Sequence, residues 1–195
     1  EKFKMPREFL LDTNAFFNLL KESRETERGS SVFASQMGIL TGGSMFISNV
    51  TKIEIISVLG RYARGRSGGF HKCTRPLSET GHLCTNTWYV PPQAKWNRRK
   101  VNMWLQLINE TLTGTSDLVT VRILSFDEKT IQYAEQIIPN ALIHNFASMD
   151  AIIAATAQEA IVNGKDLTVV TSDKGLKACL QKNRYPVLGC FWLIF

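Results

Sequence analysis

Four acidic residues stand where the hydrophobic pattern changes from strand-like to helical, and they are Asp12, Glu54, Asp150 and Asp173. Parallel strands bring their carboxyl ends to one edge of a sheet, so these side chains are expected to converge. Carboxylates held together repel one another and take up protons unless a cation joins them. Mg²⁺ or Mn²⁺ suits such a site, because hard cations prefer carboxylate oxygen. The chemistry predicted is metal-assisted hydrolysis of a phosphoryl group.

Each acid also has a purely structural explanation. Asp12 and Asp173 could be helix N-caps, each stabilising a helix by roughly 1 kcal/mol. Thr51 and Glu54 have the spacing of a capping box, with Thr51 as the N-cap. Asp150 in a first helical turn would suit the helix dipole. The functional interpretation therefore depends on the four acids being considered together.

Other hydrolytic chemistries are less well placed in the sequence. None of the three histidines, His71, His82 and His144, stands at the end of a predicted strand, so no serine–histidine or cysteine–histidine pair is indicated. A phosphatase of the haloacid dehalogenase type needs a second aspartate two residues after the first, and Asn14 occupies that position.

The elements that would position the acids alternate along the chain. Strands are predicted over 7–11, 45–47, 118–124, 167–170 and 187–195. Helices are predicted over 15–21, 32–40, 51–63, 97–112, 127–138, 149–162 and 174–181. This alternation predicts an α/β fold, with a mostly parallel sheet covered by helices on both faces.

The chain of 195 residues suits one domain, 1–195, with an insertion at 64–96 that glycines and prolines mark as irregular. Its composition, 44% hydrophobic and 21% charged, is that of a folded protein. No apolar run is long enough to cross a bilayer, and no signal peptide is visible. Four cysteines do not make a disulfide framework, so a cytoplasmic location is expected, with Cys179 and Cys190 in the core.

Together, the motifs resemble those of the PIN-domain ribonucleases. The resemblance rests on Leu10-Leu11-Asp12-Thr13-Asn14, on Glu54, on the helix that runs from Asp150 to Ala157, and on Val169 to Asp173. It covers about residues 7–63 and 97–195, and it is strongest to the VapC-type toxins of toxin–antitoxin pairs. The insertion at 64–96 is longer than this family usually carries.

The resemblance implies a PIN-like three-layer fold with a five-stranded, mostly parallel sheet, and Mg²⁺- or Mn²⁺-dependent hydrolysis of RNA to 5′-phosphate and 3′-hydroxyl products. It assigns catalysis to Asp12, Glu54, Asp150 and Asp173, and metal binding to Asp12, Asp150 and Asp173. Asp12 and Asp150 would be the direct ligands. Glu54 and Asp173 would bind through water, orient the nucleophile or hold a second ion. Asn14 and Thr171 match supporting positions, with turn chemistry as the alternative.

The function expected is that of a metal-dependent endoribonuclease restrained by a small antitoxin protein, with a homodimer as a further candidate partnership. Two alternatives remain open. One is a free-standing PIN nuclease in RNA processing or turnover, and the other is a non-catalytic module that binds nucleic acid or protein.

The net charge of +6 is concentrated in one stretch. Residues 61–100 hold nine bases and one acid, whereas the remainder holds 14 bases and 16 acids. A local basic patch indicates a polyanionic partner, although a solvated loop can be equally basic. The candidate RNA contacts are Arg64, Arg66, Arg98, Arg99 and Lys100.

The insertion carries two further signals. His71-x-Cys73 and His82-x-Cys84 could supply four ligands to Zn²⁺, although this spacing is not a common zinc-finger pattern and reduced thiols in a loop are the alternative. Trp88, Tyr89 and Trp96 are interleaved with lysine and arginine, and such aromatic rings can stack on nucleobases while the cations contact phosphates. The alternative is that the tryptophans anchor the insertion to the core or are buried at a subunit contact, which is favoured for Trp88 and Trp104.

Overall fold

The computed structural model describes residues 8–26, 43–73, 85–117, 119–144 and 146–189. The chain divides into two compact units, of which the first comprises 1–55 and 106–195 and the second comprises 56–105. The boundaries between them fall inside helices α3 (Asn49–Arg64) and α4 (Arg98–Thr113).

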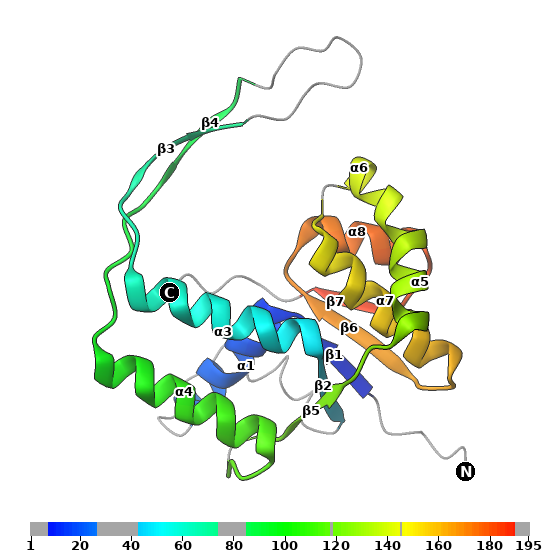
Figure 1. Cartoon of the computed structure of the whole chain (residues 1–195), viewed down its shortest axis with the longest axis horizontal. Coiled ribbons are helices and arrows are strands. Elements are labelled where there is room, and N and C mark those ends of the chain that lie inside the picture. Colours follow the sequence, from blue (N-terminus) through cyan, green and yellow to red (C-terminus); the bar gives the residue numbers. More distant parts are fainter. Residues whose placement is uncertain (1–7, 27–42, 74–84, 118, 145, 190–195) are drawn as a thin grey trace. The chain divides into compact units, whose positions relative to one another are not determined.

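The first unit is built on a five-stranded sheet with the order β5-β2-β1-β6-β7 (Figure 1). Its strands are β1 (Glu8–Leu11), β2 (Ser44–Ser48), β5 (Val121–Leu124), β6 (Leu167–Thr171) and β7 (Val187–Gly189). Every neighbouring pair is parallel, which confirms the predicted α/β fold.

Helices connect these strands, as parallel pairing requires. They are α1 (Thr13–Thr26), α5 (Glu128–Ile137), the 3-10 helix η1 (Ile138–Asn140), α6 (Ala141–His144), α7 (Ser148–Val162) and α8 (Lys174–Lys182). In Figure 1, α5, α7 and α8 gather on one side of the sheet. The sequence did not predict α6 or η1.

The sheet is buried on both faces, which is why its strands are almost continuously apolar. Leu10, Phe46 and Val169 pack against the α5, α7 and α8 side chains in one core cluster. Their chain neighbours Phe9 and Leu11 point to the opposite face, because side chains alternate along a strand, and they are also buried. The rich alanine content of α7 lets that helix pack closely, as its composition predicted.

The strand order reverses beside β1. From β1 the chain moves outward through β2 to β5, and it then returns to place β6 on the other side of β1. The carboxyl ends of β1 and β6 therefore flank a topological switch point, which is where open α/β sheets bind ligands. Asp12 follows β1 directly, and Thr171 ends β6.

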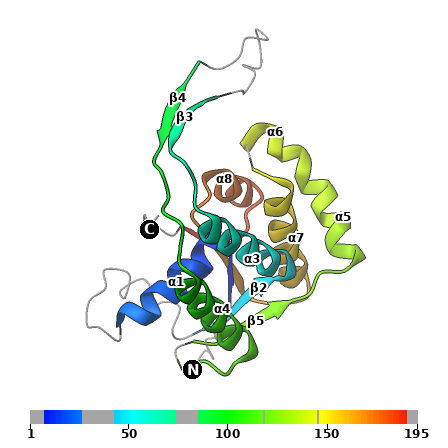
Figure 2. The ribbon, with the colours of Figure 1, turned by 60° about the vertical axis from the view of Figure 1, so that its left-hand side comes forward.

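The second unit contains a two-stranded antiparallel ribbon of β3 (Gly69–Lys72) and β4 (Thr87–Val90). Figure 2 shows this ribbon leaving the end of α3 and returning to the start of α4. The prediction that the insertion at 64–96 is irregular was therefore wrong for the residues of both strands. Glycines and prolines flank the paired residues, and those flanks obscured two short stretches of strand-forming aromatic residues.

Some of the predicted helices and strands include residues that the structure does not describe. The helix expected over 32–40, and the part of the last strand beyond 189, lie outside the described residues. The strand expected from 118 begins at Val121, and residue 118 is likewise outside the description. Among the helices that the structure describes, none is long and apolar enough to cross a membrane.

Candidate active site

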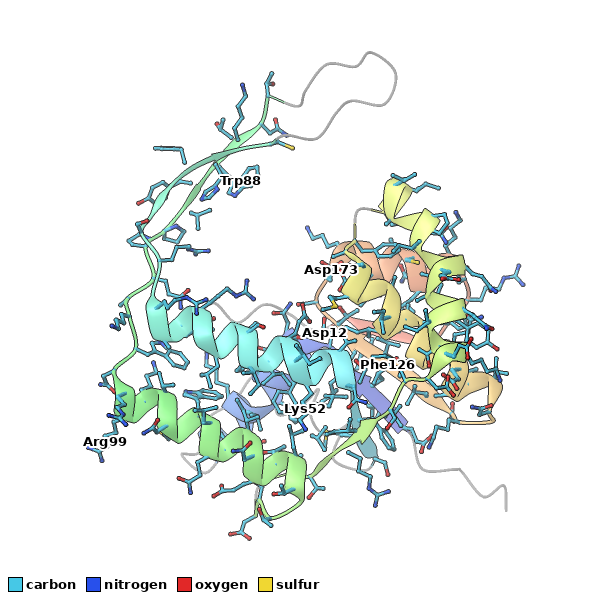
Figure 3. All side chains as sticks on the ribbon, in the orientation of Figure 1. Asp12, Lys52, Trp88, Arg99, Phe126 and Asp173 are labelled. Atoms are coloured by element: carbon cyan, nitrogen blue, oxygen red, sulfur yellow. The ribbon has the colours of Figure 1, made fainter. Side chains whose placement is uncertain are left out.

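Asp12 lies at the junction of β1 and α1 (Figure 3) and is only 4% exposed. It is the N-cap of α1, because its Oδ1 accepts a 2.6 Å hydrogen bond from the backbone N–H of Ala15. The pKa of Asp12 is raised to about 6, because burial and, to a smaller extent, the nearby Asp150 raise it by more than its hydrogen bonds lower it. The carboxyl group is thus a helix cap whose ionised form is disfavoured by its surroundings.

Thr171 fixes the second oxygen of this carboxyl group. The register pairs Leu11 with Val170, so the next residues along the two strands, Asp12 and Thr171, are level with each other. The Thr171 hydroxyl donates a 2.5 Å hydrogen bond to Asp12 Oδ2 and accepts a 3.0 Å bond from the backbone N–H of Asp173. The hydroxyl is fully buried, so one side chain links the two strand ends.

Asp173 lies two residues beyond the end of β6 and caps α8 (Figure 3). Its Oδ1 accepts a 2.7 Å hydrogen bond from the backbone N–H of Leu176. Oδ2 has no hydrogen-bond partner among the described residues, so one oxygen of this half-buried group remains available.

Asp150 lies in the first turn of α7. Its Oδ2 accepts a 2.8 Å hydrogen bond from the backbone N–H of Ala147, the residue before the helix. Burial raises the pKa of Asp150, and the neighbouring charges of Asp173 and Glu54 raise it further. The Oδ1 atom of Asp150 also has no hydrogen-bond partner within the described ranges.

Glu54 is held by a contact that the sequence did not predict. The predicted capping box was wrong, because α3 begins at Asn49 and its N-cap is Ser48, whose Oγ accepts a 3.1 Å hydrogen bond from the backbone N–H of Thr51. Glu54 therefore lies beyond the cap. Its Oε2 accepts a 2.5 Å hydrogen bond from the Thr13 hydroxyl, which joins α3 to the start of α1.

The four acids form one electrostatic group. Asp12 interacts with Asp150, and Asp150 interacts with both Asp173 and Glu54, and every one of these interactions raises a pKa. Repulsion of this kind is what a bound cation would relieve. The described part of the chain places no basic side chain in a salt bridge with any of the four.

The donor set suits a hard divalent cation that keeps most of its water. Among the described residues, no three histidine, cysteine, aspartate or glutamate side chains are arranged to hold a metal ion as they stand. Mg²⁺ is commonly held by only one or two carboxylates, with water completing its shell. Asp12 and Asp150 could serve as that pair, and the free oxygens of Asp173 and Glu54 could accept hydrogen bonds from the ion's water.

The remaining predicted residues are not joined to this group by any described contact. Asn14 is half-buried in α1, and its side chain makes no hydrogen bond with another described residue. The candidate RNA contacts are all exposed and belong to the second unit: Arg64, Arg66, Arg98, Arg99 and Lys100.

The zinc prediction is only partly covered by the structure. His71 is in β3 and Cys73 follows it, whereas His82 and Cys84 lie outside the described residues, so this site stays a prediction. Cys179 is a buried core residue, as expected, and Cys190 lies outside the described part of the chain.

One residue at the acidic group was missed in the sequence. Thr13 lies inside the Asp12-Thr13-Asn14 motif, and a hydroxyl beside a strand-end acid was the available signal. Its contact with Glu54 spans 41 residues of sequence, so no local pattern shows it.

A parallel sheet with carboxylates at its switch point defines the chain as an α/β protein. The chain belongs to the PIN domain family, whose match spans residues 9–179. Members of this family are generally nucleases. No curated protein sequence matches the chain.

Several solved structures are similar to the chain. One is the DNA-bound VapBC from Salmonella typhimurium, with 15% identity over 94% of this chain and 98% of that chain and a TM-score of 0.48. Another is FitAcB from Neisseria gonorrhoeae, with 20% identity over 92% and 96% and a TM-score of 0.47. A third is VapBC2 from Rickettsia felis bound to a promoter DNA fragment, with 12% identity over 93% and 98% and a TM-score of 0.50. At such identity, this third likeness indicates a shared fold and nothing more.

Proposed function

We propose that the protein is an Mg²⁺- or Mn²⁺-dependent endoribonuclease and that it acts as the toxin of a toxin–antitoxin pair. One observation carries the nuclease proposal: four carboxylates interact electrostatically at the switch point, and the most buried of them has its pKa raised to about 6. Keeping these neighbouring carboxylates charged is costly, and no described basic side chain pairs with them. The site is therefore suited to a divalent cation.

The residues would divide the work as follows. Asp12 and Asp150 would hold the ion, and Thr171 would keep the Asp12 carboxyl group in position. The ion would supply Lewis-acid stabilisation of the phosphate charge and lower the pKa of water. Glu54, oriented by Thr13, and Asp173 would hold the attacking water in line with the scissile phosphodiester.

The direct test is cleavage of a mixed pool of single-stranded RNA with and without Mn²⁺. We expect wild-type protein to cleave only with the metal and to leave 5′-phosphate ends, and we expect Asp150→Asn to lose that activity. Asp166→Asn is the matched control, because Asp166 is an exposed aspartate in the turn before β6. Cleavage by Asp150→Asn at the wild-type rate would refute the assignment.

The toxin proposal rests on the VapC-type motifs and on the fold shared with VapBC2 from Rickettsia felis. It predicts that expression of the wild-type chain arrests growth, that Asp12→Asn does not, and that a small protein from the same operon relieves the arrest. A nuclease that cleaves RNA without arresting growth would instead be a free-standing processing enzyme.

The third possibility, a binding module without catalysis, is disfavoured because all four acids are present together. It would be supported if RNA bound to the wild-type protein without being cleaved in Mg²⁺ or Mn²⁺.

A further inference from the structure

The ribbon of β3 and β4 carries an aromatic pair on each of its two faces. Phe70 is paired with Tyr89 across the strands, with ring centroids 5.2 Å apart. His71 is paired with Trp88, with ring centroids 6.1 Å apart and planes inclined by 19°. Because side chains alternate along a strand, these pairs face opposite sides of the ribbon.

Neither pair is covered by the described part of the second unit. Phe70 is 82% exposed, Tyr89 55% and Trp88 50%, and Trp88 is seen on the ribbon in Figure 3. A two-stranded ribbon with no core is marginally stable in water, and exposed aromatic groups of this size usually mark a binding surface. Trp88 is not buried by the described part of its own unit, and the expectation that it anchors the insertion to the core or is buried at a subunit contact stays a prediction.

An anchor is described at the foot of the ribbon, and it is made by other aromatic residues. The Trp96 ring stacks on Tyr62, with centroids 4.5 Å apart, and packs near the buried Trp104, at 5.9 Å. The Lys100 ammonium group lies 4.1 Å from the Trp96 ring centroid. Trp96 is therefore engaged by its own unit, and the exposed rings of the ribbon stay available.

The second unit is also strongly and uniformly basic. Its described residues, 56–73 and 85–105, include eight lysines and arginines and no aspartate or glutamate. All eight are exposed: Arg61, Arg64, Arg66, Lys72, Lys95, Arg98, Arg99 and Lys100. The described part of this surface has no carboxylate to balance these cations, and it is complementary to a polyanion.

The exposed rings and the basic side chains together indicate which kind of polyanion would bind. The ribbon exposes rings and cations together, and the one aliphatic residue of β3 and β4, Val90, is half-buried. Aromatic residues and arginine also occur in protein interfaces, but eight cations with no described carboxylate among them favour a polyanion over a protein partner. Ring faces can stack on unpaired bases of any sequence, while lysine and arginine follow the phosphates. Duplexes hide their base faces, so the ribbon suits single strands.

We propose that the Phe70–Tyr89 and His71–Trp88 pairs form a base-stacking platform that binds single-stranded RNA, with the basic residues of the same unit contacting its phosphates. This inference rests on the proposed function and deepens it by assigning substrate capture to the insertion. Binding would require no divalent cation, since neither ring stacking nor the contacts of lysine and arginine with phosphates depend on one.

The test measures the affinity of the full chain for a fluorescent uridine 12-mer by anisotropy, in EDTA so that no cleavage occurs. Trp88→Ala and Tyr89→Ala should each weaken binding about tenfold, while the dependence of affinity on salt keeps its slope, because no phosphate contact is lost. Trp88→Phe, which keeps a ring, should retain most of the affinity.

Leu142→Ala is the matched control, because Leu142 is a large apolar residue that is 94% exposed on α6 of the first unit. It should bind the 12-mer as wild type does, and all variants should show wild-type circular dichroism. Unchanged affinity in the Trp88→Ala, Tyr89→Ala double variant would overturn the platform. So would retention of RNA affinity with loss of a protein partner, which would make the ribbon a protein-docking surface.

The outcome is separable from that of the nuclease proposal. A protein that binds the 12-mer through Trp88 but cleaves no RNA in Mn²⁺ sustains the platform and refutes the nuclease. A protein that cleaves RNA in Mn²⁺, and whose affinity for the 12-mer does not change in the Trp88 and Tyr89 variants, sustains the nuclease and refutes the platform.

Discussion

The Thr171 hydroxyl donates a 2.5 Å hydrogen bond to Asp12 Oδ2, across the two central strands of the sheet. The Thr171 hydroxyl oxygen also accepts a hydrogen bond from the backbone N–H of Asp173, so the hydroxyl proton is directed at Asp12. Three strand-end groups are thereby held in a fixed relation by one buried side chain. The hydroxyl also lowers the pKa of Asp12, opposing the effect of burial.

Thr171→Val should therefore weaken metal binding and activity while leaving the fold intact. Loss of a group that orients a metal ligand typically costs about 10- to 100-fold in metal affinity or activity. The measurement is the Mn²⁺ dependence of the RNA cleavage rate. Thr171→Ser, which keeps the hydroxyl, should restore most of the activity.

Thr111→Val is the control for that experiment. The Thr111 hydroxyl is equally buried and has no hydrogen-bond partner among the described residues, so its removal should not disturb the Mn²⁺ dependence. A Thr171→Val protein with a wild-type Mn²⁺ profile would show that the Asp12 contact has no role in the site.

The raised pKa of Asp12 predicts a pH-dependent cost in stability. Its pKa is about 6 in the folded state, against 3.8 unfolded, so the folded state holds the proton more tightly. Stability of the metal-free protein should fall as pH rises from about 4 to 7, by roughly 3 kcal/mol for this group. Asp12→Asn should remove that dependence and be the more stable protein at pH 7.

Urea unfolding at pH 4 and pH 7 in EDTA measures this difference, with Asp166→Asn as an exposed control. Added Mn²⁺ should then raise the stability of the wild-type protein at pH 7 but not that of Asp12→Asn, because only the former gains a bound ion. If Asp12→Asn were the less stable protein at pH 7, the charged carboxyl group would not carry the predicted cost in stability, because asparagine caps a helix about as well as aspartate does.

The Thr13–Glu54 hydrogen bond predicts that these residues act as one unit. Thr13→Val and Glu54→Gln should lower kcat by similar factors, roughly tenfold, and the double variant should be little worse than either. Cleavage kinetics at saturating Mn²⁺ give the comparison. Thr13→Ser should behave as wild type, and additive losses would mean that Thr13 supports the fold rather than Glu54.

The sequence predicted the sheet and the acids because both follow from local patterns. The apolar runs of β1, β2 and β6 end abruptly, and Asp12 and Asp173 stand just beyond two of those ends. The structural and functional explanations of these acids proved compatible, since both residues do cap helices. Capping leaves Asp173 one free oxygen, and it places both side chains at the switch point.

What the sequence did not predict depends on register and on distant contacts. Thr51 had the spacing of a cap, but Ser48 is the cap because β2 runs to residue 48 and α3 starts immediately afterwards. Thr13 reaches Glu54 across 41 residues of sequence, and no local pattern encodes that contact. The ribbon was missed because four-residue strands bounded by glycine and proline carry too short an alternation to be recognised.

Arg98 and Arg99 begin α4, and their exposed side chains belong to the basic surface of the second unit (Arg99 is labelled in Figure 3). Charge reversal of both should weaken RNA binding more at low salt than at high salt, because each phosphate contact contributes about 0.7 to the salt slope for a single strand. Arg122→Glu with Lys129→Glu changes the net charge equally on exposed residues of the first unit and is the control. Anisotropy across a salt series should give a shallower slope for the Arg98, Arg99 variant than for this control. Equal losses of affinity at every salt concentration would instead indicate that the two arginines support the packing of α4.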